Sequence, residues 1–348
     1  MKNIKILPVL FILAGIMIIQ GCNMNKKPPA SAGPTVSFEA QIPDFQKQPF
    51  TTYSLSEKAK INPDQAQAQV RKLLDISGET KYFDLNKAVK DNDILWFNHK
   101  KDPSAFVKIN LQNGDISFNN GTMAYMEKKS TQNLLKKEEA IRMANSYMEK
   151  MGFKIADDKS LVLTHVGGVN MGNHDAKEGT KIFEKFTTVR YDRILDNIPV
   201  LGHSRIIVIM AEKGKLQQMI ANWAPLSSAA VSKERVVIQD DLKNSIEKHL
   251  VADNSGAKKI IVKKITLVYY DDGTGILEPA LHAICEVQIP KSKNDTTLIT
   301  VKHDLVEPIL KDAKMMYTYM AAKRDIMPKQ ADTANMKEQL IKGSDERK

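Results

Sequence analysis

Several features that would point to a specific chemistry are missing from this chain of 348 residues. Two cysteines are too few for a disulfide scaffold or a structural zinc cluster. The His-Glu-x-x-His, Gly-x-Ser-x-Gly, Walker and Cys-x-x-Cys motifs are all absent. The composition, 42% hydrophobic and 26% charged, excludes a polytopic membrane protein and wholesale disorder. The sequence therefore predicts a folded, non-enzymatic protein without a cofactor.

The N-terminus has the organisation of a secretory signal, predicted over residues 1–21. Lys2 and Lys5 make its start basic, and a nearly unbroken apolar run follows from Ile6 to Ile19. A helix that crosses a bilayer core needs roughly 20 apolar residues, and this run is shorter. We therefore expect cleavage of the segment and not a permanent transmembrane span.

The end of this segment, Ile19-Gln20-Gly21-Cys22, resembles the lipobox of bacterial lipoproteins. The resemblance implies that Cys22 becomes the first residue of the mature chain and carries lipid such as palmitate. An uncleaved anchor, or an ordinary signal with an incidental Cys22, is the alternative. The implied location is the cell envelope: the outer membrane facing the periplasm, which Asn23 favours in two-membrane bacteria, or the outer face of the cytoplasmic membrane.

The rest of the chain divides by composition and periodicity. Residues 22–50 contain five prolines and few periodic apolar residues, which predicts a flexible tether. Three units follow, over residues 51–130, 131–226 and 232–326, and a polar tail is predicted over residues 327–348. The length also allows two modules in place of three.

Each unit begins with a helical pattern and continues with strand patterns. Asn62-Pro63 predicts the start of the first helix, which Gly78 ends, and strands joined at Asn113-Gly114 predict a hairpin. The second helix ends at Gly152, and the third is marked by apolar residues at helical spacing, Leu242, Ile246 and Leu250. The pattern predicts an α+β protein, with two or three repeated modules of a helix packed on an antiparallel sheet.

Part of the second unit resembles a known family. The segments 137–144 (KEEAIRMA), 191–200 (YDRILDNIPV) and 214–216 (GKL) are similar to PepSY-like domains of thermolysin-type propeptides and envelope lipoproteins. The resemblance covers about residues 134–223, with fainter echoes on both sides. It implies a module that binds, inhibits or assists another exported protein, and it transfers no catalytic residue.

Two predicted loops contain candidate site residues. The glycine-rich stretch from Gly167 to Gly179 lacks the Lys-Ser/Thr of a phosphate cradle, so we expect a long hairpin loop. Within it, the pair His174-Asp175 would act as a base or ligand only with partners from elsewhere. The pair Asp271-Asp272 lacks the spacing of a calcium loop and predicts a turn.

Sulfur-containing residues have core interpretations. A period of two places Cys285 on one strand face with Leu281, Ala283, Val287 and Ile289, and His282 on the other. Cys285 is therefore predicted to be a buried apolar residue and not a nucleophile. The methionines near the C-terminus are predicted to fill core space and not to bind copper or haem: Met315, Met316 and Met320.

The predicted function follows from location more than from motifs. The formal net charge is +10, but the lysines are dispersed and export separates the chain from cytosolic nucleic acid, so no nucleic-acid partner is expected. We predict a membrane-anchored envelope lipoprotein with a non-enzymatic binding or regulatory role and an exported or cell-wall partner. The alternatives are an inhibitor or folding helper of a secreted peptidase, and an envelope hydrolase with an unrecognised site.

Overall fold

The computed structural model describes residues 33–313, apart from 45–49, 57–59, 155–156, 176–178, 228–238, 293–294 and 312. The predicted signal, Cys22, the three C-terminal methionines and the polar tail lie outside the described residues. None of the described helices has the length and apolar character needed to cross a bilayer.

The three long helices form where periodicity predicted them. They are α1 (Pro63–Ser77), α3 (Lys137–Met151) and α4 (Gln239–Asp253), each of 15 residues, and α2 (Met123–Met126) is a single turn. Asn62 and Gln65 form a capping box at the start of α1, because each side chain accepts a hydrogen bond from the backbone N–H of the other at 2.9 Å. Gly78 ends this helix with a φ of 74°, which favours glycine.

Fourteen strands form one mixed sheet, which contradicts the prediction of repeated helix-on-sheet modules. Its main path runs β14-β13-β12-β9-β8-β10-β11-β6-β5-β4-β3, while β1, β2 and β7 pair beside it with β12, β13 and β8. The strands are β1 (Thr35–Phe38), β2 (Tyr53–Ser54), β3 (Val89–Asp91), β4 (Ile94–Asn98), β5 (Ala105–Asn110), β6 (Ile116–Asn120), β7 (Leu161–Asp175), β8 (Gly179–Leu195), β9 (Ile198–Gly202), β10 (Arg205–Met210), β11 (Leu216–Asn222), β12 (Lys259–Asp271), β13 (Ile276–Ser292) and β14 (Asp295–Pro308).

The modular prediction fails because of which strands pair. Strand β11 of the second unit pairs with β6 of the first, so α1 and α3 cover one continuous stretch of sheet and share one core. Buried residues of that core come from both helices, among them Leu73 and Met148. The N-terminal half of the sheet consists of eight strands: β3, β4, β5, β6, β11, β10, β8 and β7.

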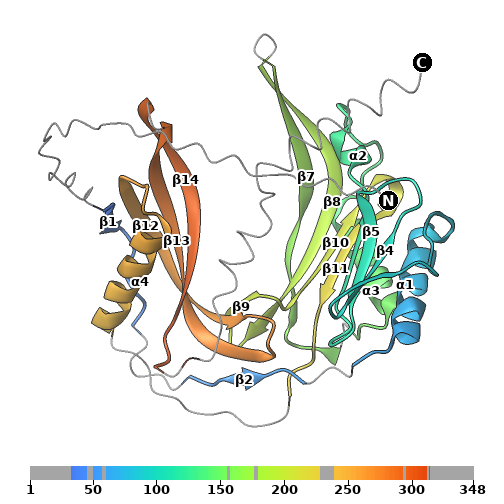
Figure 1. Ribbon diagram of the computed structural model, residues 1–348, viewed down its shortest axis with the longest axis horizontal. Helices are drawn as coiled ribbons and strands as arrows, with labels where there is room; N and C mark the ends of the chain where they lie inside the picture. The colour runs from blue at the N-terminus through green and yellow to red at the C-terminus, as the bar shows by residue number, and fades with distance from the viewer. Residues whose placement is uncertain are drawn as a thin grey trace, which may run out of the picture.

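The C-terminal half consists of β12, β13 and β14 with α4 packed against them. Leu242, Ile246 and Leu250 of α4 are buried, as their spacing predicted. Strand β9 joins the halves, because it pairs antiparallel with the end of β8 and parallel with the end of β12. Figure 1 shows α4 at one end of the molecule and α1 and α3 at the other, with the strands between them.

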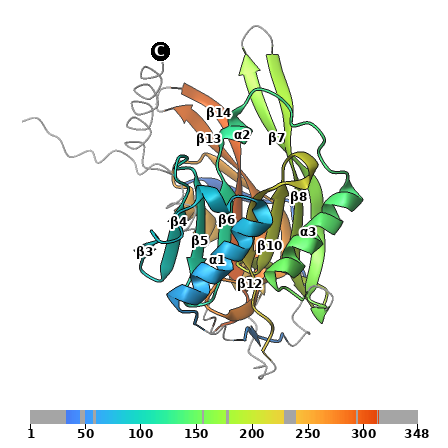
Figure 2. The same cartoon turned by 90° about the vertical axis from the view of Figure 1, so that its right-hand side faces the viewer.

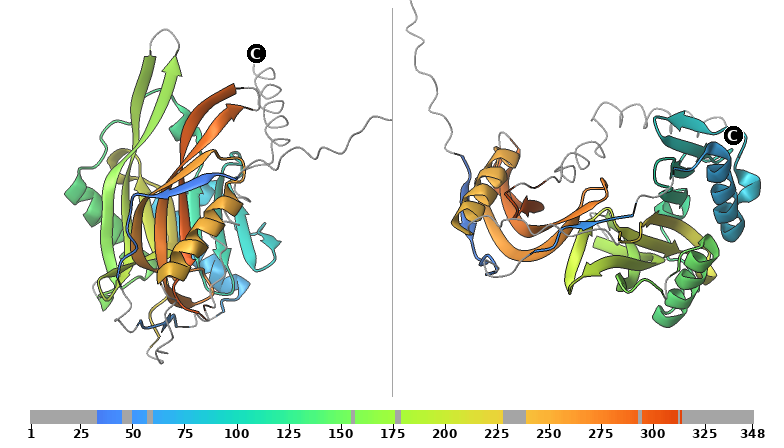
Figure 3. Two further views of the ribbon diagram at one scale, coloured as in Figure 1. Left: turned by 90° about the vertical axis from the view of Figure 1, so that its left-hand side faces the viewer. Right: turned by 90° about the horizontal axis from the view of Figure 1, so that it is seen from below.

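The predicted tether is wrong for its C-terminal part. Thr35–Phe38 forms β1, which pairs in parallel with residues 259–262 of β12. Val36 and Phe38 pack against the core beneath α4, and Phe50 is buried in it. The chain before the first predicted unit therefore belongs to the last one, a long-range contact that proline content does not reveal. Figure 3 shows β1 lying beside α4.

The expected glycine-rich loop is also wrong. Gly167 and Gly168 lie inside β7, opposite Thr188 and Thr187 of β8. Strand β7 continues to Asp175, and β8 begins at Gly179. Glycine lowers strand propensity, but the long pairing with the 17-residue strand β8 outweighs it here. Figure 2 shows the hairpin extending beyond α3.

Candidate functional site

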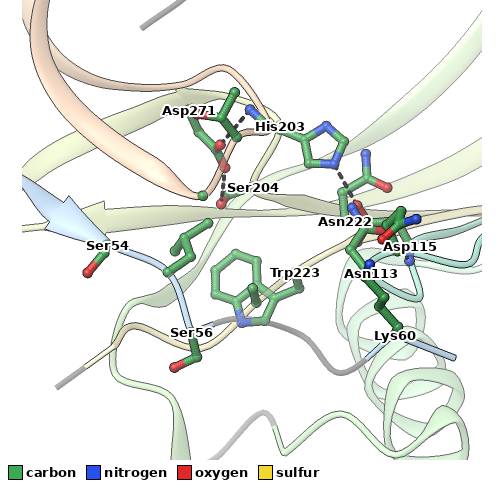
Figure 4. A pocket seen from close by; sticks show the side chains of 16 residues that line it. Ser54, Ser56, Lys60, Asn113, Asp115, His203, Ser204, Asn222, Trp223 and Asp271 are labelled. Carbon is green, nitrogen blue, oxygen red and sulfur yellow. Dashed lines mark hydrogen bonds and ion pairs between the residues drawn. The ribbon is translucent and has the colours of Figure 1, made fainter. Parts of the chain in front are cut away.

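A pocket of about 760 Å³ with a mixed polar and apolar lining lies where the two halves of the sheet meet. We call it the junction pocket (Figure 4). Its lining comes from five separate parts of the chain: Ser54, Leu55, Ser56 and Lys60; Gln112, Asn113 and Asp115; His203 and Ser204; Asn222, Trp223 and Ala224; Asp271, Gly273, Thr274 and Gly275. This volume is within the usual range for small-molecule sites, and the lining combines apolar surface with carboxylate, amide and hydroxyl groups.

The first carboxylate contact joins a turn of the N-terminal half to the link between the halves. Asp115 follows the Asn113-Gly114 turn, where the Asn113 side chain accepts a hydrogen bond from the Asp115 N–H at 3.0 Å. The Asp115 carboxylate then lies 2.6 Å from Nε2 of His203. The side chain of Asp115 is 8% exposed and that of His203 is 41% exposed, so the histidine is the partner that faces solvent.

The second carboxylate contact joins the turn between β9 and β10, which holds His203 and Ser204, to the C-terminal half. Ser204 donates its hydroxyl hydrogen bond to the carboxylate of Asp271, the last residue of β12, which is 1% exposed. The other carboxylate oxygen accepts from the Gly273 N–H at 2.9 Å, and the backbone carbonyl accepts from the His203 N–H at 2.9 Å. Asp271 therefore connects the turn between β9 and β10 with the turn between β12 and β13.

A buried arginine supports the wall of the pocket. Arg193 of β8 is 0% exposed, and its guanidinium lies 4.1 Å from the ring centroid of Trp223. It donates to the carbonyl of Ala224 and to the Ser160 hydroxyl. Burial lowers the pKa of Arg193, and the charges of Asp158 and Asp271 oppose that shift. These contacts fix the indole of Trp223 at the edge of the pocket.

The arrangement suits binding better than nucleophilic catalysis. Ser204 and His203 are adjacent in the chain, but Ser204 engages Asp271 while His203 Nε2 faces Asp115, as Figure 4 shows. A serine nucleophile needs a base in contact with its hydroxyl, and here that contact is made by a carboxylate that also holds a backbone N–H. Within the described ranges, no group of three His, Cys, Asp or Glu residues has the geometry to hold a metal ion.

Of the candidate residues from the sequence, Asp271 lines this pocket, whereas Cys285 lies elsewhere. Cys285 is 0% exposed in the core beneath α4, as predicted, and burial followed by the charge of Asp304 raises the pKa of its thiol to about 12. The pair His174-Asp175 ends β7, and its side chains lie outside the description. Asp271-Asp272 forms the predicted turn, but Asp271 also reaches the pocket.

Sequence reasoning did not find the pocket. His203, Asp115 and Trp223 stand in three separate stretches of chain, and no spacing between them marks a motif. The one available signal was that polar residues cluster next to strand-like segments, at Asn113-Gly114, His203-Ser204 and Asp271-Asp272. Polar residues next to strands are typical of ordinary turns and do not by themselves indicate a pocket. The pairing of β9 with β12 is what brings His203 and Asp271 together.

Comparisons with known proteins show only distant likenesses. No protein-family model matches the chain, and no curated protein matches its sequence. An uncharacterized protein from Eubacterium rectale is 12% identical with a TM-score of 0.44, over 81% of this chain and 91% of that one. The YpeB C-terminal domain of Bacillus megaterium is 11% identical with a TM-score of 0.32, over 70% and 99%. Neither description states an enzymatic activity, and at these scores neither likeness carries an argument about function.

Proposed function

We propose that the protein is a lipid-anchored, non-enzymatic binding protein of the bacterial cell envelope, and that the junction pocket is its ligand site. The pocket carries the binding part of this proposal. The lipobox resemblance at Cys22 supports the anchor, and the PepSY-like resemblance of residues 134–223 supports a role that acts through binding.

The lining favours a small ligand rich in hydroxyl and amide groups. The side chains of Asn113, Asn222 and Gln112 line the pocket, and each carries both a donor and an acceptor. Trp223 adds an aromatic surface beside these polar groups. Saccharides combine hydroxyl groups with apolar ring faces, so a short glycan is the ligand class that this set of side chains fits best.

Intrinsic fluorescence tests the proposal directly. The chain has two tryptophans, so Trp96→Phe leaves Trp223 as the single reporter at the pocket. We expect N,N′-diacetylchitobiose to change its emission in a saturable way. Asn222→Ala should weaken that binding, whereas Asn170→Ala, which lies on β7 away from the pocket, should leave it unchanged. Absence of a saturable change, or equal effects of the two variants, would contradict the proposed ligand site.

The anchor needs a separate test, because the pocket would bind ligand with or without it. Labelled palmitate should enter the wild-type chain in bacteria and should not enter Cys22→Ser. Incorporation that persists in Cys22→Ser would overturn the anchor and leave the pocket proposal standing.

A further inference from the structure

The open edges of the sheet differ in how they are protected from pairing with another chain. Apart from the short strands β1 and β2, the edges are β3, β7 and β14. Native edge strands avoid such pairing by being short, charged or interrupted by bulges. Strand β3 has only three residues, two of them Lys90 and Asp91. The register of β7 shifts twice, between Leu163 and His165 and between Val169 and Asn170.

Strand β14 is long and nearly uncharged over seven consecutive exposed residues, and its register shift against β13 lies at the start of this run, between Asp295 and Leu298. The run is Thr296, Thr297, Leu298, Ile299, Thr300, Val301 and Lys302. Five of the seven are β-branched, which favours strand pairing, and only the last is charged. Leu298, Ile299 and Val301 are 46%, 41% and 39% exposed.

From Leu298 onward the run is regularly paired on one side and accessible on the other. Its pairing with β13 shows no register shift from Leu298 to Pro308, and within the described residues no strand pairs with its outer edge. Figure 1 shows this end of the β13–β14 hairpin extending beyond α4. Unpaired backbone N–H and C=O groups on such an edge are a template for a further strand.

The charge distribution indicates which strand fits. Asp295 stands before the run and Lys302 ends it. A second copy placed antiparallel about Ile299 brings Asp295 of each chain close to Lys302 of the other, so opposite charges meet at both ends. A parallel copy in register would put Asp295 against Asp295 and Lys302 against Lys302. In the antiparallel arrangement Leu298 lies opposite Thr300, and Ile299 opposite its own copy, which are favourable cross-strand neighbours.

We propose that β14 is a homodimerisation edge, where two copies of the chain join their sheets antiparallel about a two-fold axis through Ile299. Such an interface is isologous, so both copies use the same edge and no free β14 remains. Because β3 and β7 are protected, the assembly stops at two chains. This inference is independent of the junction pocket, which lies at the other end of β12 and β13.

Disulfide trapping in the full-length chain on bacterial membranes tests the proposal. Directly opposite residues of antiparallel strands have Cα atoms about 4.5–5.5 Å apart, within the range that a disulfide spans. Ile299→Cys should therefore form a covalent dimer under mild oxidation. Thr296→Cys should not, because its two copies would be about 20 Å apart along the strands. Val89→Cys, on β3 and 55% exposed, controls for random collisions.

A second substitution separates pairing from collision. Val301→Lys adds a cation beside Lys302, so it should remove most of the dimer that Ile299→Cys forms. Val89→Lys on β3 is the matched control and should leave that dimer intact. Circular dichroism of each variant should match the wild type, which excludes misfolding as the cause.

The outcomes decide the proposal either way. Equal trapping at positions 299, 296 and 89 would overturn it. A crosslinked species whose mass is not twice that of the chain would also overturn it, because a different protein would then occupy the edge. Position-specific trapping that Val301→Lys removes and Val89→Lys does not would establish it.

Discussion

Arg193 offers the sharpest test of how the junction pocket is held, because a neighbouring arginine on the same strand is its matched control. Arg193→Met keeps a long apolar side chain against Trp223 but removes the guanidinium. Arg190→Met makes the same change at a side chain that is 38% exposed and pairs with Asp192. The two variants differ in burial and partners, and not in the atoms removed.

The expected magnitude follows from the contacts of the buried guanidinium. Arg193→Met removes the hydrogen bonds to the Ala224 carbonyl and the Ser160 hydroxyl. It also takes the positive charge away from Asp158 and Asp271, which remain in place. Removing one partner of a buried charged group typically costs about 3–5 kcal/mol. Asp158 keeps hydrogen bonds from Ser160 and Trp223, so we expect the lower end, about 3 kcal/mol.

Arg190→Met should change stability by less than about 1 kcal/mol, because exposed ion pairs contribute little. Urea unfolding followed by circular dichroism measures both values, with the slope against urea checked for constancy. A large apolar side chain sometimes replaces a buried charge without loss. If Arg193→Met is as stable as Arg190→Met, the view that this arginine holds the pocket wall is refuted.

Four further outcomes follow from particular contacts. Thiol reagents at pH 8 should modify native Cys285 far more slowly than the unfolded chain, since burial raises its pKa to about 12; equal rates would place it outside the core. Phe38→Ala should cost about 2 kcal/mol in thermal or urea unfolding because the ring packs beneath α4, and no loss would restore the flexible-tether prediction. Gly202→Ala should lower the free energy of unfolding by about 2 kcal/mol or more, because its φ is 106° and a Cβ would lie 2.0 Å from the Asp271 carbonyl oxygen. Gly256→Ala is the control: its Cβ would meet no such neighbour, so equal losses in the two variants would contradict this reason. Burial acts to raise the pKa of Asp158, but hydrogen bonds from Ser160 and Trp223 and the charge of Arg193 lower it overall. The stability that ionised Asp158 contributes should therefore be complete above pH 3.8 and lost as the pH falls through the lowered pKa. An acid unfolding profile that is unchanged in Asp158→Asn would contradict this pH dependence.

The amino-acid sequence by itself determined where local structure begins and ends. Asn62 and Gln65 cap α1 through their own backbone neighbours, and Gly78 ends it, so these features needed no distant partner. The same holds for the Asn113-Gly114 turn, and for the face of β13 that buries Cys285, which depends on the period of two alone. Each of these contacts lies within a few residues along the chain, which is why periodicity and capping residues predict them.

Only the tertiary structure decided how these elements combine. Pairing of β6 with β11 merged two predicted modules into one core, and the parallel pairing of β1 with β12 joined residues more than 200 positions apart. The junction pocket depends on β9 bridging the halves, which brings Asp115, His203 and Asp271 together from three turns. Backbone N–H and C=O groups are the same in every strand, so local sequence specifies that a strand forms but leaves its partner to the packing of side chains across the whole chain.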